Sequence, residues 1–578
     1  MRKINYKRYY ADFETTKPNE LNQVRVYIWA LTSFNNNLIE YGETIESFVD
    51  YILKLKYSYI YFRNGSGFDF KFIIPYLLQN DIKFKTLEKM GTIYQLEIKN
   101  VKLRDSMLLL PMSLKEACNN FNTNYFKTSI DYDVPYEHNA TWEEVKYCIN
   151  DVLCDSEATE NFLKEIKELC DSEGWTKSSK KIYDKMTISG IAFECFKESS
   201  FYEKCCENRI LPYSFLRKAY YGGFVYSSCK MIESNNLKME DNNSMYPFVY
   251  SSALLPVGNA TLVDDEKDLK NYDLYVIRVY ICFELRDGYV PIIPKDRLFK
   301  SCNNNYMKSS DGDYIELTLT CWDFERIKKY YICDYQFISA YGFMAQPNFY
   351  KKYADRLIKI KNESLGAKRY VSKILLNSPY GKLALNTQEE ETTYSLDENG
   401  YLKREVVIVK DEEQSNYLAQ ALFITAGARK VLFDRAELIG WNNILYTDTD
   451  SIKYDDIKNL NLETDSKTLG AWKNEGKPKF FKTTAPKRYI YYEENKLYIK
   501  CAGFKLYDLL YQLCLKIGLS DDYILNNIDM KSKDNIVIDY DKALLIASLF
   551  KSGLKIKHLQ KRRALNGVYL EIIEKEMS

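Results

Sequence analysis

Two aspartates separated by one threonine constrain this chain more than any other feature. Asp448 and Asp450 lie in the string Tyr446-Thr447-Asp448-Thr449-Asp450-Ser451-Ile452, which follows the apolar residues at 444–445. Apolar residues on both sides of a short polar centre predict two strands joined by a tight turn. We therefore expect a hairpin that presents two carboxylates, and an ordinary Asp-rich turn between strands is the simpler alternative.

A third carboxylate lies upstream in a similar setting. Asp241 ends a predicted strand within a strand-rich region at 236–300, and the aromatic ring of Tyr246 follows five residues later. The full string is Asp241-Asn242-Asn243-Ser244-Met245-Tyr246-Pro247. We interpret Asp241 as the upstream partner of the hairpin acids.

A second set of acids lies near the N-terminus. Asp12 and Glu14 are two residues apart on a predicted strand, so both side chains point to one face. Such a pair alone is common on the solvent face of a strand. Asp69 and Asp151 add two carboxylates, and Tyr147 lies four residues before Asp151 on one face of a helix. Four acids can hold two Mg²⁺ or Mn²⁺ ions that hydrolyse a phosphodiester bond, with Tyr147 orienting the water.

The bulk properties limit the class of protein. A chain of 578 residues predicts several domains, since one domain usually takes about 100 to 200 residues. Lysine and arginine total 81 against 80 acids, so any path for nucleic acid must be a local basic groove. The two histidines and 14 irregularly spaced cysteines give poor support for zinc sites. The absence of a long uncharged stretch predicts a soluble cytoplasmic protein.

Apolar periodicity predicts an α/β region first, followed by strand-rich regions that flank a basic helical segment. The expected strands lie at 7–13, 24–32 and 57–63, and the expected helices at 69–79 and 141–169, with Thr141 as an N-cap. The strand-rich regions are 236–300 and 440–500, and the polar stretch at 386–417 predicts an excursion or hairpin.

The basic segment at 351–382 places several cations and polar groups about four residues apart, largely on one side of a helix. Its members are Lys361, Arg369, Lys373, Asn377, Tyr380 and Gly381. A triphosphate needs such cations, although basic helices are about as often solvated faces. Pro379 cannot donate a helical hydrogen bond and should kink or end the helix.

Together these strings resemble family B DNA polymerases. Asp241 to Pro247 is similar to motif A, and Asn377-Ser378-Pro379-Tyr380-Gly381-Lys382 is similar to motif B, with Pro379 in place of the usual Leu. Met245 also replaces a Leu, an exchange that conserves volume. The resemblance implies that Asp241 and Asp450, with Asp448, bridge two metal ions, that Tyr246 excludes a ribose 2′-OH, that Lys361 and Lys373 grip the triphosphate, and that Asn377 and Tyr380 line the nascent base pair.

The N-terminal acids resemble the three motifs of DEDDy proofreading exonucleases, with Asp12, Glu14, Asp69 and Asp151 as metal ligands. This resemblance implies that Thr15, Asn64, Phe68, Ser106 and Met107 hold a single-stranded 3′ end and that Lys127 contacts the scissile phosphate. Arg63 stands where such enzymes usually carry His.

Three smaller strings resemble DNA-contacting elements of the same polymerases. Tyr220-Tyr221-Gly222-Gly223-Phe224 is similar to the motif that links exonuclease and polymerase, and its glycines would allow close approach to a DNA strand. Lys487-Arg488-Tyr489 is similar to the element that holds the primer terminus. Thr425 and Arg429 are weaker candidates for primer contacts.

Residues 253–348 and 385–417 resemble the two insertions of protein-primed phage replicases, which start from a terminal-protein hydroxyl. The implied fold is α+β and multidomain: an N-terminal ribonuclease H-like α/β 3′→5′ exonuclease, then a right-hand polymerase of palm, fingers and thumb. The expected domains are 1–185 exonuclease, 186–252 first part of the palm, 253–348 insertion for terminal-protein or DNA docking, 349–384 fingers, 385–417 second insertion for processivity and strand displacement, 418–501 second part of the palm, and 502–578 thumb.

The resemblance implies a replicative DNA-dependent DNA polymerase with proofreading, strand displacement and protein-primed initiation. It implies two Mg²⁺ ions in each active site, or Mn²⁺ instead. The implied partners are template and primer DNA, dNTPs, a terminal protein and a single-stranded DNA-binding protein, without a membrane, in the cytoplasm of a bacterial host. Basic residues for docking the terminal protein are Lys295, Arg297, Lys300 and Lys308.

Two other interpretations stay open from the sequence. A linear-plasmid or nucleic-acid-primed family B polymerase would share both acid sets. A free-standing exonuclease with an attached DNA-binding module would explain residues 1–185 but leave Asp241 and Asp450 without a role.

Overall fold

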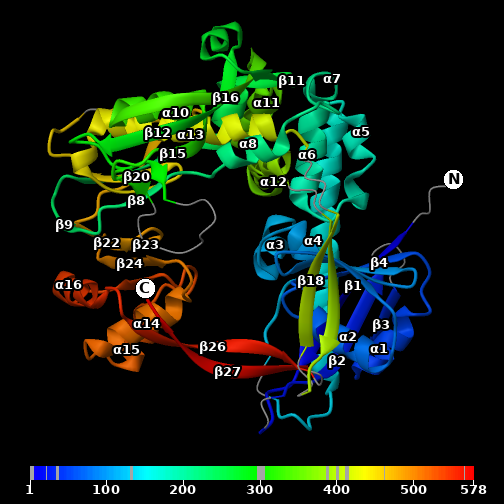
Figure 1. The fold of residues 1–578 in the computed structure, drawn as a ribbon. Helices are drawn as coiled ribbons and strands as arrows, with labels where there is room; N and C mark the ends of the chain where they lie inside the picture. Colours follow the sequence, from blue (N-terminus) through cyan, green and yellow to red (C-terminus); the bar gives the residue numbers. More distant parts are fainter. Residues whose placement is uncertain are drawn as a thin grey trace.

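The protein is an α/β chain of several connected parts. The computed structural model describes residues 6–20, 23–33, 38–130, 134–295, 306–385, 389–398, 402–410, 416–460, 462–564 and 567–577. The N-terminal part and the C-terminal helices lie on opposite sides of the view, and a layer of sheet and helices spans the top (Figure 1).

A seven-stranded sheet forms the N-terminal part, in the order β3-β2-β1-β4-β7-β6-β5. β1 pairs in parallel with β4, and β4 with β7, which places the carboxyl ends of all three at one edge. The three predicted strands are confirmed as β1, β2 and β4. The strands are β1 (Lys7–Thr15), β2 (Val26–Ser33), β3 (Leu38–Gly42), β4 (Ser58–Phe62), β5 (Lys85–Lys89), β6 (Thr92–Ile98) and β7 (Val101–Asp105).

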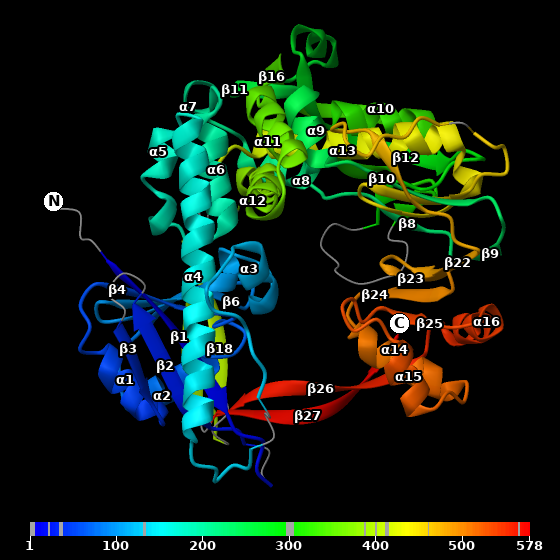
Figure 2. The same ribbon diagram turned by 180° about the vertical axis from the view of Figure 1, so that it is seen from behind.

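The helix α4 (Trp142–Ser172) crosses this sheet along β1 and β2 (Figure 2). Thr141 caps it as predicted: its hydroxyl accepts from the Glu144 N–H, and the Glu144 carboxylate accepts from the Thr141 N–H. The same part contains the predicted helix at 69–79, which is confirmed. The other helices here are α1 (Ile45–Ile52), α2 (Phe70–Gln79), η1 (Ser106–Leu108), α3 (Leu114–Asn120), α5 (Thr176–Ser179) and η2 (Ile182–Asp184). The chain continues through α6 (Ile188–Glu198) and α7 (Tyr202–Cys205) to α8 (Tyr213–Ala219), which packs against β15 (Ile315–Thr320) and α13 (Leu418–Ile439).

A five-stranded sheet carries the second acid set, in the order β21-β10-β20-β19-β8. The predicted hairpin is confirmed, because β19 and β20 pair antiparallel and turn through Thr449, whose φ is +57°. Its elements are β8 (Val225–Ser227), β10 (Leu237–Asn242), β19 (Ile444–Asp448), β20 (Ser451–Asp455) and β21 (Trp472–Gly476), with helices α9 (Met245–Ser252), α13 (Leu418–Ile439) and η5 (Trp441–Asn443).

A second five-stranded sheet, in the order β25-β24-β23-β22-β9, joins strands from both sides of residue 502, because β24 pairs with β25. Three helices and a long terminal hairpin complete this region, and the hairpin reaches α2 of the N-terminal part. The elements are β9 (Met231–Glu233), β22 (Phe480–Ala485), β23 (Arg488–Glu493), β24 (Lys496–Cys501), β25 (Asn535–Val537), α14 (Leu506–Lys516), α15 (Asp521–Asn527), α16 (Tyr540–Leu549), β26 (Lys555–Ala564) and β27 (Gly567–Glu576).

The first predicted insertion contains a four-stranded sheet, in the order β11-β16-β12-β15. The polar stretch after residue 385 contains the hairpin β17–β18, as predicted, and Arg404 of that hairpin pairs with the buried Glu88 of β5. The elements are β11 (Leu254–Val263), η3 (Glu266–Asn271), β12 (Leu274–Leu285), β13 (Ile293–Pro294), β14 (Tyr306–Met307), β15 (Ile315–Thr320), α10 (Cys321–Tyr330), β16 (Tyr331–Pro347), β17 (Glu389–Leu396) and β18 (Leu402–Lys410).

The basic segment is two helices rather than one, which corrects our interpretation. α11 (Lys351–Glu363) ends before Ser364, and α12 (Gly366–Asn377) begins at Gly366, whose φ is +54°. A left-handed backbone cannot continue a helix, so the chain reverses there and α11 packs against α12. The predicted end at Pro379 is confirmed, because α12 stops at Asn377 and the short helix η4 (Tyr380–Ala384) follows.

The two basic helices also contact the C-terminal half of α4. The Tyr370 ring of α12 lies 6.4 Å from the Phe162 ring, and Arg356 of α11 pairs with Glu173 at 2.6 Å. No helix among the described residues is long and apolar enough to cross a membrane.

A buried ion pair fixes α13 behind the second acid set. Two nitrogens of Arg435 donate to one oxygen of Glu240, at 2.9 and 2.7 Å, and the Tyr454 hydroxyl donates to the other oxygen at 2.8 Å. Glu240 immediately precedes Asp241 on β10, so this pair ties the helix to the strand that carries a predicted catalytic acid.

Replacing Arg435 with Ala should therefore lower the free energy of unfolding by about 3–5 kcal/mol, because it leaves the buried Glu240 charge unpaired. Equilibrium urea denaturation measures this loss. The matched control is Lys430→Ala on the same helix, whose pair with Asp434 is exposed and should contribute less than about 1 kcal/mol. Equal losses in both variants would contradict the role of the buried pair.

Candidate active sites

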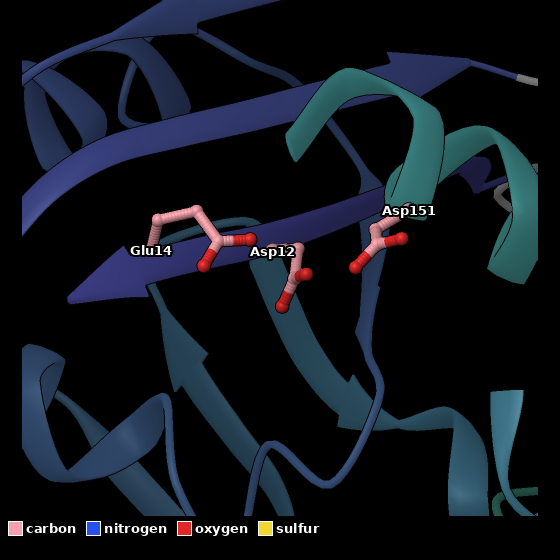
Figure 3. A group of neighbouring side chains, drawn as sticks. All are labelled: Asp12, Glu14 and Asp151. Atoms are coloured by element: carbon pink, nitrogen blue, oxygen red, sulfur yellow. The ribbon is translucent and has the colours of Figure 1, made fainter. Parts of the chain in front are cut away.

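The first acid cluster lies where β1 meets α4. Asp12 and Glu14 extend from one face of β1, and Asp151 reaches toward them from α4 (Figure 3). One carboxylate oxygen from each of the three lies within 4.8 Å of the other two. The structure thus brings together three of the four predicted ligands.

Asp69, the fourth predicted ligand, is buried at the start of α2. Burial raises its pKa, and so does the negative charge of Asp12. Burial and Asp151 raise the pKa of Asp12 to about 7, and burial and Asp12 raise the pKa of Glu14 to about 9. Burial first, and the neighbouring carboxylates second, thus disfavour the charged forms of these acids.

Unpartnered oxygens show that this cluster fits a divalent cation. Among the described residues, neither carboxylate oxygen of Asp69 has a hydrogen-bond partner, and neither does Oδ1 of Asp151. Buried polar atoms are nearly always satisfied, so such oxygens indicate a missing ligand. Oxygen-only donors suit Mg²⁺ or Mn²⁺.

Lys127 provides a protein cation at the same cluster. Its amino group contacts the Asp151 carboxylate and the hydroxyl of the buried Tyr147. The predicted phosphate ligand and the predicted water-orienting tyrosine therefore lie together beside the acids. As a predicted phosphate contact, Lys127 would have to exchange Asp151 for the phosphate of a bound strand.

Arg63 points away from the acids and serves a buried network. Its guanidinium pairs with Asp155 at 2.9 Å and donates to the backbone carbonyls of Leu110 and Met112. The Ser106 hydroxyl also donates to Asp155, at 2.7 Å, and Ser106 is fully buried. Ser106 therefore positions the loop rather than facing solvent. Sequence reasoning missed Asp155, although its place one turn after Asp151 could have suggested it.

The other predicted strand-binding residues surround the cluster. Thr15 ends β1, and Asn64 follows β4 with a left-handed φ of +63°. The Asn64 and Met107 N–H groups both donate to Asp105, which fixes the two loops together. The Phe68 ring lies edge-on to Phe72, 5.3 Å away.

The second acid site lies at one end of the sheet of β10, β19 and β20. The backbone register pairs Asp241 with Ser451, and the Asn242 N–H donates to the Asp450 carbonyl at 2.7 Å. Burial and Asp241 raise the pKa of Asp450 to about 6. Asp448 lies at the end of β19 and accepts from the Tyr446 hydroxyl at 3.3 Å.

Three residues that the sequence analysis did not assign complete this site. Lys473 lies opposite Asp241 on the neighbouring strand β21, 3.1 Å from Asp241 and 3.2 Å from Glu475. Lys453 of β20 is buried, and burial lowers its pKa although the nearby Glu475 and Asp241 oppose that effect. Strand register places Lys473 opposite Asp241, a pairing between distant segments that the sequence does not reveal.

The predicted nucleotide-binding residues converge on the start of α9. Lys361 Nζ lies 3.4 Å from Asn243 Oδ1, and the rings of Tyr246 and Tyr380 stack with centroids 4.2 Å apart. The Asn377 side chain donates instead to the backbone carbonyl of Lys373, one turn earlier. Lys361, Tyr246 and Tyr380 thus face the acids from the side of the basic helices.

The predicted primer contacts divide into two groups. Lys487 lies 3.5 Å from Asp448, and the Tyr489 ring lies 5.0 Å from Tyr446, so both are at the acid site. Thr425 and Arg429 are instead buried in α13. We therefore assign these two an indirect role, in place of the expected primer contact.

Arg429 of α13 binds the backbone of the Tyr220–Phe224 motif. It donates to both carboxylate oxygens of Asp323 and to the carbonyls of Tyr221 and Gly222 at 2.8 and 2.9 Å. A side chain at Gly223 would collide with Thr449 of the acid hairpin, whereas Gly222 has open space. Close packing against the hairpin explains Gly223, and only Gly222 is free for approach by another strand. Tyr220 of this motif lies beside Arg217, with 5.1 Å between its ring and the guanidinium.

Two of the predicted docking lysines line one open pocket. Lys295 and Lys308 border a cavity of about 680 Å³ between β8 and the first insertion. Tyr226, Tyr289 and Tyr306 are also in its wall. Arg297 and Lys300 lie outside the described residues.

Comparison with known proteins identifies the family. A family model described as DNA polymerase type B, organellar and viral, matches residues 49–142 and 133–469. The chain belongs to this family. The match includes Asp69 and Asp151 as well as Asp241 and Asp450, so the alternative of a free-standing exonuclease is wrong.

Phage enzymes are similar to this type B polymerase over most of its length. The DNA polymerase of Bacillus phage Nf is 29% identical over 87% of this chain and 89% of its own, and that of Bacillus phage phi29 is 29% identical over 90% and 91%. A solved structure of phi29 DNA polymerase with primer-template DNA and incoming nucleotide covers 99% of this chain and 100% of its own, at 25% identity and a TM-score of 0.80. This type B polymerase is thus a DNA-directed DNA polymerase of the protein-primed kind, with the predicted α+β multidomain fold.

Mg²⁺ bound at the first acid cluster of the polymerase should offset the repulsion among its carboxylates. In the parent, Mg²⁺ should raise the midpoint of thermal unfolding by about 1 °C for each kcal/mol of binding energy, as expected for a chain of 578 residues. In EDTA, the variant Asp12→Asn with Glu14→Gln should unfold at a higher temperature than the parent, because fewer like charges remain. In Mg²⁺ the same variant should lose most of the rise seen in the parent, because two metal ligands are gone. Differential scanning calorimetry measures both effects.

The matched control changes two exposed acids of α1, Glu46→Gln with Asp50→Asn. This variant should keep the Mg²⁺-dependent rise. A full rise in the Asp12 and Glu14 variant would contradict metal binding at this cluster.

Proposed function

We propose that this polymerase replicates a linear genome with two metal-dependent sites, one for nucleotidyl transfer at Asp241 and Asp450 and one for 3′→5′ proofreading at Asp12, Glu14, Asp69 and Asp151. The observation that carries the proposal is the presence of two separate sets of carboxylates with raised pKa values, each beside a lysine and a tyrosine. DNA and dNTPs are the proposed substrates. In their support, phi29 DNA polymerase has been solved in complex with primer-template DNA and incoming nucleotide substrates.

The residues of the second site suit nucleotidyl transfer. In this reaction the primer 3′ oxygen forms a bond to the α-phosphorus, the bond to the bridging oxygen breaks, and its electron pair leaves with pyrophosphate while the hydroxyl proton passes to solvent. Two divalent ions held by Asp241 and Asp450, with Asp448 beside them, would supply charge stabilisation and activate the hydroxyl. Lys487 would hold the primer terminus, and Lys361, Lys373 and Arg369 would bind the triphosphate.

The stacked tyrosines would form the pocket for the nascent base pair and sugar. Tyr246 is held by its contact with Tyr380, so a ribose 2′-OH would collide with a ring that cannot easily turn away. Asn377 lies at the end of α12, just before Tyr380, and would line the same pocket.

The residues of the first site suit hydrolysis of the primer 3′ end. Two divalent ions held by the four acids would generate hydroxide and stabilise the leaving 3′ oxygen. Tyr147 would orient the attacking water, Lys127 would bind the scissile phosphate, and Phe68 would stack on a base. The network of Arg63, Asp155 and Ser106 would keep the strand-binding loop in register with the acids.

Separate mutation of the two sites tests the central proposal. Asp12→Ala with Glu14→Ala should abolish 3′→5′ degradation and retain primer extension, and Asp450→Ala should do the reverse, each by at least about 1000-fold. The assays are degradation of a 5′-labelled single strand and extension of a recessed primer with Mg²⁺ and dNTPs. Loss of both activities in one folded variant would show that the sites are not separate.

We extend the proposal to initiation and strand displacement. A terminal protein would present a hydroxyl where the primer 3′-OH otherwise lies, and the lysine-lined pocket beside the first insertion offers a dock near the acid site. The β17–β18 hairpin would enclose the template together with the N-terminal part, which it contacts through Arg404 and Glu88. Enclosure would let the enzyme stay bound and separate the strands ahead of it.

Protein priming has a direct chemical signature. Enzyme, the terminal protein encoded by the same genome, labelled dATP and the genome-end template should give a covalent protein–nucleotide adduct. Lys295→Glu with Lys308→Glu should reduce adduct formation about 10-fold or more and leave oligonucleotide extension nearly unchanged, because only the docking step uses that surface. The control variant is Lys267→Glu with Lys270→Glu, elsewhere in the same insertion. The absence of an adduct while oligonucleotides extend normally would rule out this priming role.

A further inference from the structure

The edge strand β21 brings a lysine to the nucleotidyl-transfer acids. Lys473 Nζ lies 3.1 Å from Oδ1 of Asp241 and 3.2 Å from Oε1 of Glu475, and about a third of the side chain is exposed. Although burial opposes the charged form, the hydrogen bond to Asp241 raises the pKa of Lys473. The Lys473 amino group is therefore in contact with a carboxylate that the proposed reaction requires for divalent ions.

The backbone fixes Lys473 at this place. Strand β21 pairs with β10 so that Lys473 is opposite Asp241. Beyond the strand, the Asn243 N–H donates to the Ala471 carbonyl and the Gly470 N–H donates to the Asn243 carbonyl, both at 2.9 Å. The main chain of Lys473 thus cannot drift from the turn that leads into α9, and only its side chain is free to move.

The basic helices present more cations to the same turn. Lys361 lies 3.4 Å from the Asn243 side chain. Burial lowers the pKa of Lys361, followed by the positive charges of Arg369, Lys373 and Lys473. Lys473, on the sheet that contains β10 and β21, is therefore close enough to Lys361 for their charges to repel.

This arrangement allows the Lys473 side chain one favourable change of partner. A divalent ion held by Asp241 Oδ1 would repel the ammonium group 3.1 Å away, so metal binding would push Lys473 away from that oxygen. Glu475 remains within 3.2 Å and keeps the displaced amino group at the site. A triphosphate bound between Asp241 and Lys361 would offer the Lys473 amino group charged oxygen acceptors, which bind it more strongly than water does.

We propose that Lys473 is a further substrate-binding residue, which leaves Asp241 for the triphosphate of the incoming nucleotide and contacts the pyrophosphate product before release. The inference rests on the assignment of nucleotidyl transfer to Asp241 and Asp450. Buried Lys453, on the adjacent strand β20, lacks this freedom and remains a fixed counter-charge for the acids.

Kinetics of single-nucleotide insertion test the triphosphate contact. The comparison is Lys473→Gln against Lys477→Gln, an exposed lysine four residues later, both in the Asp12→Ala, Glu14→Ala background. Lys473→Gln should raise KM for dNTP and for pyrophosphate in the reverse reaction by about 10- to 100-fold, with kcat changed much less. Lys477→Gln should match the parent, and Lys473→Arg should restore most of the nucleotide binding. An unchanged KM in Lys473→Gln would overturn the contact.

Metal binding without turnover tests the exchange of partners. Mn²⁺ bound in the absence of DNA and nucleotide, measured by electron paramagnetic resonance, should bind several-fold more tightly to Lys473→Gln, because no lysine competes for Asp241. A merely structural ion pair would give equal or weaker Mn²⁺ binding, and that result would overturn the exchange.

Two controls distinguish failure of the Lys473 role from failure of the proposed nucleotidyl-transfer site. Asp450→Ala in the same insertion assay should be inactive, and activity there would refute the nucleotidyl-transfer site itself. Lys473→Gln in the exonuclease-competent chain should degrade single strands at the parental rate, which shows that the variant is folded.

Discussion

Repulsion between partly buried carboxylates is the constraint on which the rest of this structure depends. Catalytic metal ions need several carboxylates within reach of one point, yet the acids destabilise one another until the ions bind. The chain meets this requirement with strands and helices rather than loops. Asp12 and Glu14 lie on a central strand, Asp241 and Asp448 end neighbouring strands, and Asp151 extends from a long capped helix. Such elements cannot relax apart without breaking a sheet.

The two sites differ in how protein cations offset this repulsion. At the first site Lys127 alone contacts an acid, and the oxygens of Asp69 have no partner among the described residues. At the second site Lys453, Lys473 and Lys487 approach the acids from three different strands or their ends. Under the proposed function, the second site also accepts a highly charged nucleotide. Cations that can change partners suit a site whose charge changes within each cycle.

The sequence was sufficient wherever a function depends on spacing within one segment. The alternation around Asp12, the hairpin of Asp448 and Asp450, and the cap at Thr141 are local patterns, and the structure has all three. Roles set by contacts between distant segments could not be predicted. Lys473 and Glu475 matter because β21 pairs with β10 more than 200 residues earlier, and Asp155 matters because Arg63 and Ser106 fold onto it. Burial of Arg429 was equally invisible, since its partner Asp323 belongs to an insertion.

The helix α4 fixes the distance between the first acid cluster and the point where α12 contacts this helix. Asp151 and Phe162 are 11 residues apart on this helix, which is about 16 Å at the rise of an α-helix. The Tyr370 ring of α12 lies near Phe162, so α12 and the first acid cluster, through Asp151, both contact this one helix. If α12 swings when a nucleotide enters, the movement must pivot at this ring contact or break it. In the proposed proofreading cycle, the primer end would therefore move between two sites that share one rigid helix.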